Sequence, residues 1–207
     1  MGRPLGIPGD AAFQKRVLRA CLQLLETATG PIIEDFGEEA PAVGNENSSA
    51  SCPINFARPP ERLEGSEAIA ASLKAEIGRL TPWYDRHVNA EGRTSFGSST
   101  LPLADIVTII SSMFNEQLPA PPVPAMSLAE GLRLAVEDLK AFYTEAMMAQ
   151  PGASPNDALI HWFWNNTAAG RILLDMKEIC LQSGDEELQL FSNVFLVPRS
   201  HTDSMAS

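Results

Sequence analysis

The densest group of residues able to do chemistry lies between positions 161 and 166. This stretch holds two of the three tryptophans and one of the three histidines, beside two adjacent asparagines. His161 together with Asn165 could bind a metal or move a proton, because an imidazole changes charge near neutral pH. A solvated or hydrogen-bonded histidine would show the same pattern. Partners from other elements must therefore decide whether a site exists here.

A helical pattern places these residues on faces. Apolar residues recur at helical spacing from Ser154 to Gln182, which predicts one long helix with proline at its first position. At 100° per residue, Trp162 and Asn166 fall on the apolar face, whereas His161 and Trp164 fall opposite. A buried amide without a partner costs about 1–3 kcal/mol, so we expect Asn166 to be hydrogen-bonded. Its partner would be a neighbouring helix or loop, or a ligand.

A second dense group follows a proline that is expected to break a helix. It comprises Trp83, Tyr84, Asp85, Arg86 and His87. In an extended segment Asp85 and His87 would point the same way, so Asp85 could orient His87 as a base, or both could reach a metal. The alternative is a turn in which the two aromatic rings seal the core and the charged groups face water.

The loop from Gly92 to Thr100 is a candidate anion site. It combines two glycines, Arg93 and several hydroxyls just before a helix. Exposed amides at a helix start favour phosphate or carboxylate groups. The loop lacks the Gly-Lys-Ser/Thr ending of a nucleotide-binding loop, and a plain connection between elements would have the same composition.

No catalytic, cofactor or metal signature accompanies these groups. Carboxylate-bridged iron bundles need paired Glu-x-x-His motifs, which are absent, and the acidic run near Phe36 lacks the spacing of a calcium loop. We therefore predict no metal site and leave the cofactor and any catalytic residue open.

Charge and cysteine content narrow the partners and the compartment. The net charge of −11 disfavours nucleic acid and an anionic membrane surface, because both are recognised through basic patches. Three cysteines without metal or redox spacing favour reduced thiols in the cytoplasm.

Apolar periodicity predicts the elements that must position these groups. Helices are expected over residues 10–29, 66–80, 103–117, 127–150 and 154–182, with a short last helix after Asp185. Ser127 and Glu130 have capping-box spacing. A long irregular loop covers 37–64, and a proline-rich strap covers 119–124. These elements predict a mainly α single-domain bundle of five or six helices around the 103–117 helix, with at most a short strand pair. The domain would span 10–198, between a disordered lead-in (1–9) and a flexible tail (199–207).

Two functions fit this pattern. In the first, the protein binds a small molecule, with an anion as one option, in a pocket between helices. The candidate ligand-binding residues are His161, Asn165, Asn166, Trp162, Trp83, Tyr84, Asp85, His87 and Arg93. In the second, it is a non-catalytic accessory or scaffold subunit, and an exposed apolar patch meets a protein partner.

Overall fold

The computed structural model describes residues 5–6, 10–26, 30–38, 63, 65–150 and 156–198, with the backbone alone at 156–158. Most of the 37–64 loop, Cys52, most of the lead-in, the tail and the expected helix start at Ser154 lie outside these residues. The chain divides into two compact units, residues 1–47 and 48–207, which we describe separately. That residues 10–198 form a single domain stays a prediction.

The first unit contains α1 (Ala11–Gln23), followed by a short 3-10 turn, η1 (Leu24–Glu26). Asp10 caps α1 by accepting a hydrogen bond from the Phe13 amide at 3.0 Å. Phe13 is buried and packs edge-on against Phe36, with the ring centroids 6.0 Å apart. The Nε–H of Arg16 is shared between both oxygens of the Glu38 carboxylate, and Nη2 donates to Oε2. These contacts join α1 to residues 30–38.

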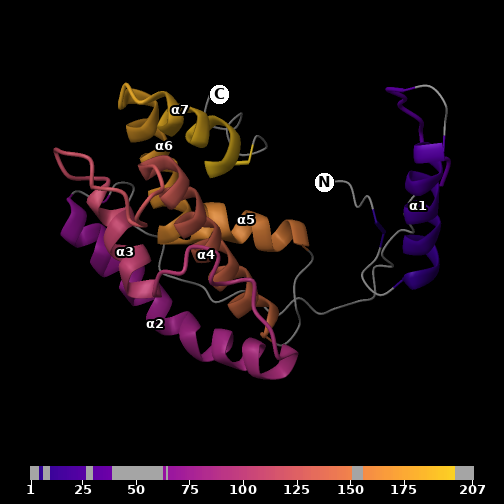
Figure 1. Cartoon of the computed structure of the whole chain (residues 1–207). Coiled ribbons are helices and arrows are strands. Elements are labelled where there is room, and N and C mark those ends of the chain that lie inside the picture. Colours follow the sequence, from indigo (N-terminus) through magenta and orange to yellow (C-terminus); the bar gives the residue numbers. More distant parts are fainter. Residues whose placement is uncertain are drawn as a thin grey trace. The chain divides into compact units, whose positions relative to one another are not determined.

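The second unit is built from six α-helices, shown in Figure 1. They are α2 (Ser66–Glu91), α3 (Leu103–Ser112), α4 (Leu128–Met148), α5 (Asn156–Asn166), α6 (Ala168–Gln182) and α7 (Glu186–Phe191), after which the π-helical turn η2 covers Ser192–Leu196. The described residues contain no strand. The mainly α class is confirmed, although the described residues form seven α-helices where five or six were expected. None of the described helices has the length and apolarity to cross a membrane.

The central helix is α4, and the expectation that the 103–117 helix would be central is wrong. α4 packs against α2, α3, α5, α7 and η2, whereas α3 packs against α2 and α4 and ends at Ser112. Ser127 caps α4 by accepting from the Glu130 amide, as the sequence predicts. The proline-rich strap packs on the first turn of α4, where a Cβ at Gly131 would lie 2.7 Å from the Pro122 ring.

The helix predicted for 66–80 continues to Glu91, through the proline that was expected to break it. Pro82 lies inside α2 on an exposed position, so its ring faces solvent and does not interrupt packing. The residue just before it, Thr81, donates its hydroxyl to the Ile77 carbonyl at 2.8 Å. Tertiary contacts of Ile69, Leu73 and Leu80, all buried, hold the helix on α3 and α4 and outweigh the local cost of proline.

Candidate functional site

The long helix predicted for residues 154–182 is divided, and the aromatic stretch 161–166 lies at the end of α5. The chain leaves helical geometry at Thr167 (φ −114°, ψ 151°), which separates α5 from α6. Thr167 is buried. Its hydroxyl donates to the Phe163 carbonyl at 2.6 Å and accepts from the Gly170 amide at 2.9 Å. A threonine that caps one helix and bonds the end of another fixes a break that apolar periodicity alone does not reveal.

The break overturns the predicted burial of this stretch. Asn166 is exposed, so the expectation of an amide buried among apolar side chains is wrong. Trp162 is buried as expected, and Trp164, assigned to the polar face, is also buried. His161 and Asn165 are exposed, and Asn165 Nδ2 donates to the His161 carbonyl at 2.9 Å.

Glu76 of α2 is the buried polar group that holds the start of α6. Only 5% of it is exposed, and its carboxylate accepts from the Ala168 amide at 2.7 Å and the Ala169 amide at 3.2 Å. Tyr143 also donates its hydroxyl to this carboxylate at 2.9 Å. Burial raises the pKa of Glu76, and these hydrogen bonds oppose that rise. Glu76 thus supplies from within the chain the anion that the start of α6 favours.

Two carboxylates of α4 likewise accept hydrogen bonds from backbone amides of the loop at 92–100. Asp138 accepts from the amides of Gly97, Ser98 and Ser99 at 2.8–2.9 Å, and from the Ser99 hydroxyl at 2.6 Å. Two turns further along α4, Glu145 accepts hydrogen bonds from the Ser95 amide and the Thr94 hydroxyl, both at 2.6 Å. The loop has amides suited to an anion, and the chain's own carboxylates occupy them.

Residues 83–87 are helical, so both the extended segment and the turn considered from the sequence are wrong. Two positions apart on a helix are rotated by about 200°, and Asp85 and His87 therefore project in different directions rather than the same one. Tyr84 packs against Phe142 at 4.8 Å between ring centroids, and its hydroxyl lies 3.0 Å from that of Thr94. The part of the earlier interpretation that survives is the aromatic packing.

One cleft brings together two of the residues singled out from sequence. His87 near the end of α2 and Arg93 of the following loop line it together with Lys140 of α4. We call it the cationic cleft; its volume is about 580 Å³, and its other lining residues are Glu91, Thr94, Ser95, Ala141, Thr144, Glu145 and Met148. His161, Asn165, Asn166, Trp162, Trp83, Tyr84 and Asp85 do not line it.

Lys140 is the cleft residue that sequence reasoning missed. Its Nζ donates to the carbonyls of Leu196 at 2.7 Å and Phe195 at 3.4 Å, and it lies 5.3 Å from the centre of the Trp164 ring. Burial lowers its pKa to about 8, while the charge of Glu137 acts in the opposite direction. No sequence pattern distinguishes this lysine from others on a polar helix face, since its partners come from the far end of the chain.

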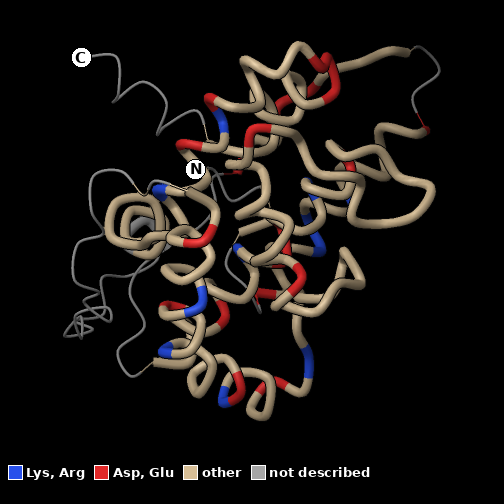
Figure 2. Tube along the Cα trace, turned by 90° about the vertical axis from the view of Figure 1, so that its left-hand side faces the viewer, with Lys and Arg blue, Asp and Glu red and all other residues tan. Residues whose placement is uncertain are grey.

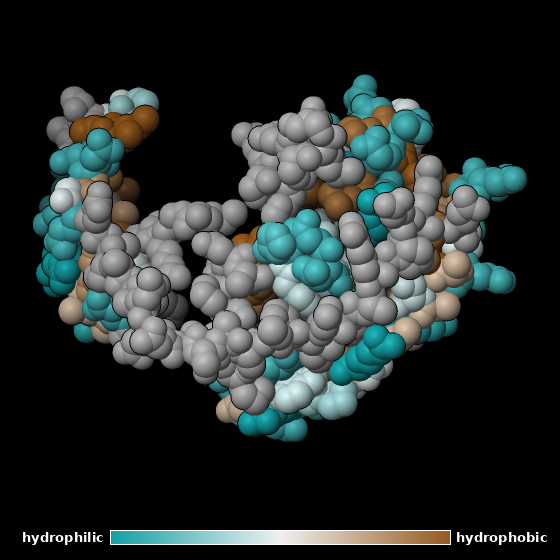
Figure 3. Space-filling view, turned by 180° about the vertical axis from the view of Figure 1, so that it is seen from behind, coloured by the Kyte–Doolittle hydropathy of each residue, from teal (hydrophilic) through white to brown (hydrophobic). Residues whose placement is uncertain are grey.

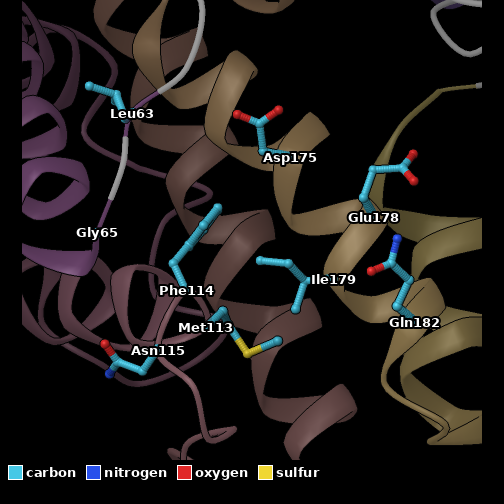
Figure 4. A pocket seen from close by; sticks show the side chains of 9 residues that line it. All are labelled: Leu63, Gly65, Met113, Phe114, Asn115, Asp175, Glu178, Ile179 and Gln182. Carbon is cyan, nitrogen blue, oxygen red and sulfur yellow. The ribbon is translucent and has the colours of Figure 1, made fainter.

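A second cleft of about 510 Å³ lies where the end of α3 faces α6. Figure 4 shows Asp175, Glu178 and Gln182 along one side of α6, with Met113 and Phe114 facing Ile179. Leu63, Gly65 and Asn115 complete its lining, and we call it the acidic cleft. The first unit has a groove of its own, between α1 and residues 34–37. In the described part of the chain, no group of three or more His, Cys, Asp or Glu side chains is arranged to hold a metal ion.

The two clefts show how charge is distributed on a chain that is acidic as a whole. Figure 2 marks acidic and basic positions along the described chain. The helices α2, α4 and α6 carry both signs, whereas α1 carries only basic residues and α3 and α7 carry only acidic ones. Local charge at each cleft is therefore set by a few side chains. Comparison with protein-family models, with curated proteins and with solved structures finds no match for this chain.

Proposed function

We propose that the protein binds a small anionic molecule in the cationic cleft. The observation that carries the proposal is the shared lining by His87, Arg93 and Lys140, which come from three different segments. A volume of about 580 Å³ suits a small molecule. The proposal keeps the sequence-based function and moves its centre from the 161–166 stretch to the end of α2.

The carboxylates of the cleft leave room for an anion. Glu145 already accepts hydrogen bonds from the Thr94 hydroxyl and the Ser95 amide, so its oxygens are directed at groups within the chain. Glu91 is exposed, where solvent screens it. The Thr144 hydroxyl supplies a further donor in the lining. A ligand carrying phosphate or carboxylate would meet the guanidinium of Arg93, the group best shaped to bind it in bidentate fashion.

Calorimetric titration with inorganic phosphate at low salt tests this proposal. We expect saturable binding that weakens at least tenfold in Arg93→Gln and in His87→Gln. Arg86→Gln is the matched control, because Arg86 is exposed, lies over the Trp83 ring and is outside the cleft lining. Equal weakening in the control, or no binding by the native protein, would contradict the proposal.

An accessory or scaffold role is the second candidate, and exposed apolar rows favour it. Leu190, Val194 and Phe195 at the end of the described chain are each more than half exposed. Figure 3 shows hydrophobic surface on the side where α6 and α7 lie. Leu18, Leu22 and Leu25 form a similar exposed row beginning on α1. Such rows are typical of surfaces that meet a partner.

Light scattering across a range of protein concentrations tests the second candidate. We expect the mass to rise above that of one chain, and Leu190→Glu or Leu22→Glu to restore the monomer. A strictly monomeric protein with no binding of an apolar dye would count against it.

We also propose a cytoplasmic location. Cys21 and Cys180 are free thiols in the structure, and Cys52 is outside the described residues.

A further inference from the structure

We propose that the acidic cleft is a second binding site, for a small organic cation with an apolar chain, such as an alkylammonium ion. Its ligand class is the opposite of that of the cationic cleft, and the inference does not depend on the proposed anion site. Three separate features of the lining point to this chemistry: its floor, its wall and the helix end beside it.

The floor of the acidic cleft is apolar. Met113, Phe114 and Ile179 line it, and Figure 4 shows their side chains directed toward one another across the space. Met113 is buried, while Phe114 and Ile179 are half-buried, so apolar surface faces the hollow. An apolar floor of this kind favours the hydrocarbon part of a ligand, because burying it removes apolar area from water.

The wall of the cleft is polar and carries negative charge. Asp175, Glu178 and Gln182 follow one another at helical spacing on the same face of α6, so their side chains rise beside the floor. Among the described lining residues there is no lysine, arginine or histidine. Arg171 forms an ion pair with Asp175 at 3.3 Å but is outside the lining, and the exposed Glu178 forms none of the ion pairs found in the described residues.

The end of α3 adds to this negative potential. α3 ends at Ser112, and Met113, Phe114 and Asn115, the three residues that follow it, all line the cleft. The carbonyl end of a helix carries a partial negative charge that favours a cation in the nearest turn. No basic residue occupies the last turn of α3. A cation bound here would face two carboxylates on one side and a helix end on the other, above an apolar floor.

The ligand must match both parts of the cleft. A metal ion would leave the apolar floor unused, and a neutral hydrocarbon would leave the carboxylates without a counter-charge. A chain of several methylene groups ending in an ammonium group satisfies both. At about 510 Å³ the cleft has space for such a molecule. Asn115 and Gln182 add side-chain amides, each with an oxygen acceptor, at opposite sides of the lining.

Amide chemical-shift mapping of the full-length protein with n-hexylammonium chloride tests the inference. We expect saturable shifts in the second half of α6 and at 113–115, with hexanoate and 1-hexanol binding at least tenfold more weakly. Glu178→Lys should abolish the interaction, and Asp175→Asn should weaken it. Glu186→Lys is the matched control, since Glu186 is exposed on α7 and outside the lining.

Three outcomes would overturn the inference: no saturable shifts, equal binding of hexanoate or hexanol, or equal loss in the Glu186→Lys control. Glu178 is exposed, so its replacement should leave the fold intact, which a thermal melt checks. The same samples titrated with inorganic phosphate separate the two sites. Loss of ammonium binding alone leaves the anion proposal standing, and the reverse result leaves this one standing.

Discussion

The cationic and acidic clefts lie on the same unit but are built in different ways. The cationic cleft takes its charged groups from three segments, the end of α2, the loop after it and the middle of α4. The acidic cleft takes its carboxylates from a single face of α6. The first therefore depends on how several elements meet, and the second on how one helix is rotated. A net charge of −11 describes neither, because each cleft is governed by a few nearby groups.

The largest expected effect comes from removing the Glu76 carboxylate, which should affect the acidic cleft more than the cationic cleft. Glu76→Ala leaves the Tyr143 hydroxyl and two α6 amides without their buried acceptor, so we expect the free energy of unfolding to fall by about 3 kcal/mol. Because α6 forms the wall of the acidic cleft, ammonium binding should suffer more than phosphate binding. Denaturant unfolding and the two titrations measure both effects.

Tyr143→Phe is the control for that change, since it removes one hydrogen bond and leaves both amide contacts. We expect it to cost about 1 kcal/mol. A larger loss in Tyr143→Phe than in Glu76→Ala would show that the carboxylate does not hold the start of α6.

Reversing one charge in each cleft sharpens the comparison. Arg93→Glu should lower phosphate affinity about tenfold or more, equal to about 1.4 kcal/mol, and leave ammonium affinity unchanged. Glu178→Lys should do the opposite. Both residues are exposed, so the fold should tolerate either change. If each variant alters both affinities, the two clefts do not act as separate sites.

Substitution at Thr167 tests whether this residue fixes the start of α6. Thr167→Ala removes the acceptor of the Gly170 amide and should cost about 1 kcal/mol. Asn166→Ala, next to it, should change stability by less than about 0.5 kcal/mol, because Asn166 is exposed. Thermal unfolding of the two variants measures this contrast, which is the reverse of what the predicted single helix implies. Equal effects would restore a role for Asn166.

The smallest expected effect is a pH dependence confined to the cationic cleft. Lys140 loses its charge as the pH rises through about 8, so affinity for sulfate, whose charge is constant there, should fall a few-fold between pH 7 and 9. Lys140→Met should bind more weakly and show a flatter profile. Hexylammonium binding should not follow this profile. A sulfate profile that is identical in both proteins would exclude Lys140 from the site.

The lowered pKa of Lys140 also makes the free energy of unfolding depend on pH. The folded pKa of about 8 is below the ordinary value of 10.5, so the folded protein releases this proton first. The contribution of Lys140 to the free energy of unfolding therefore rises as the pH increases from about 8 to 10.5, and it is least favourable below pH 8. Comparing the pH dependence of unfolding in the native protein and Lys140→Met isolates this contribution.

Sequence periodicity predicted most helices because their apolar stripes survive in the fold. The helix at 127–150 and its Ser127 cap are examples. The expectation that proline breaks a helix failed at Pro82, where tertiary contacts override it. Periodicity failed at Thr167, where a side-chain cap overrides the local pattern. At Pro82 the packing of α2 carries the helix onward. At Thr167 two hydrogen bonds end one helix and begin another, although the apolar residues on both sides keep helical spacing.

The cationic cleft was predictable in part. His87 was identified from an aromatic and polar cluster and Arg93 from a loop of glycines and hydroxyls before a helix, yet their shared cavity depends on the length of α2. Lys140 could not be found, since its burial depends on η2. A signal for Glu76 was present: positions 69, 73, 76 and 80 alternate by four and three residues, and a carboxylate in such an apolar row needs a partner.

The break at Thr167 also affects how the chain can tolerate changes in length. In one continuous helix, an added residue would turn every later position by about 100°. Here the start of α6 is held by its own cap, by the Glu76 carboxylate and by the hydrogen bond from Thr167 to the Phe163 carbonyl of α5. Insertions or deletions before residue 163 can therefore alter the aromatic stretch while Asp175 and Glu178 keep their place, which lets the two parts of this region diverge independently.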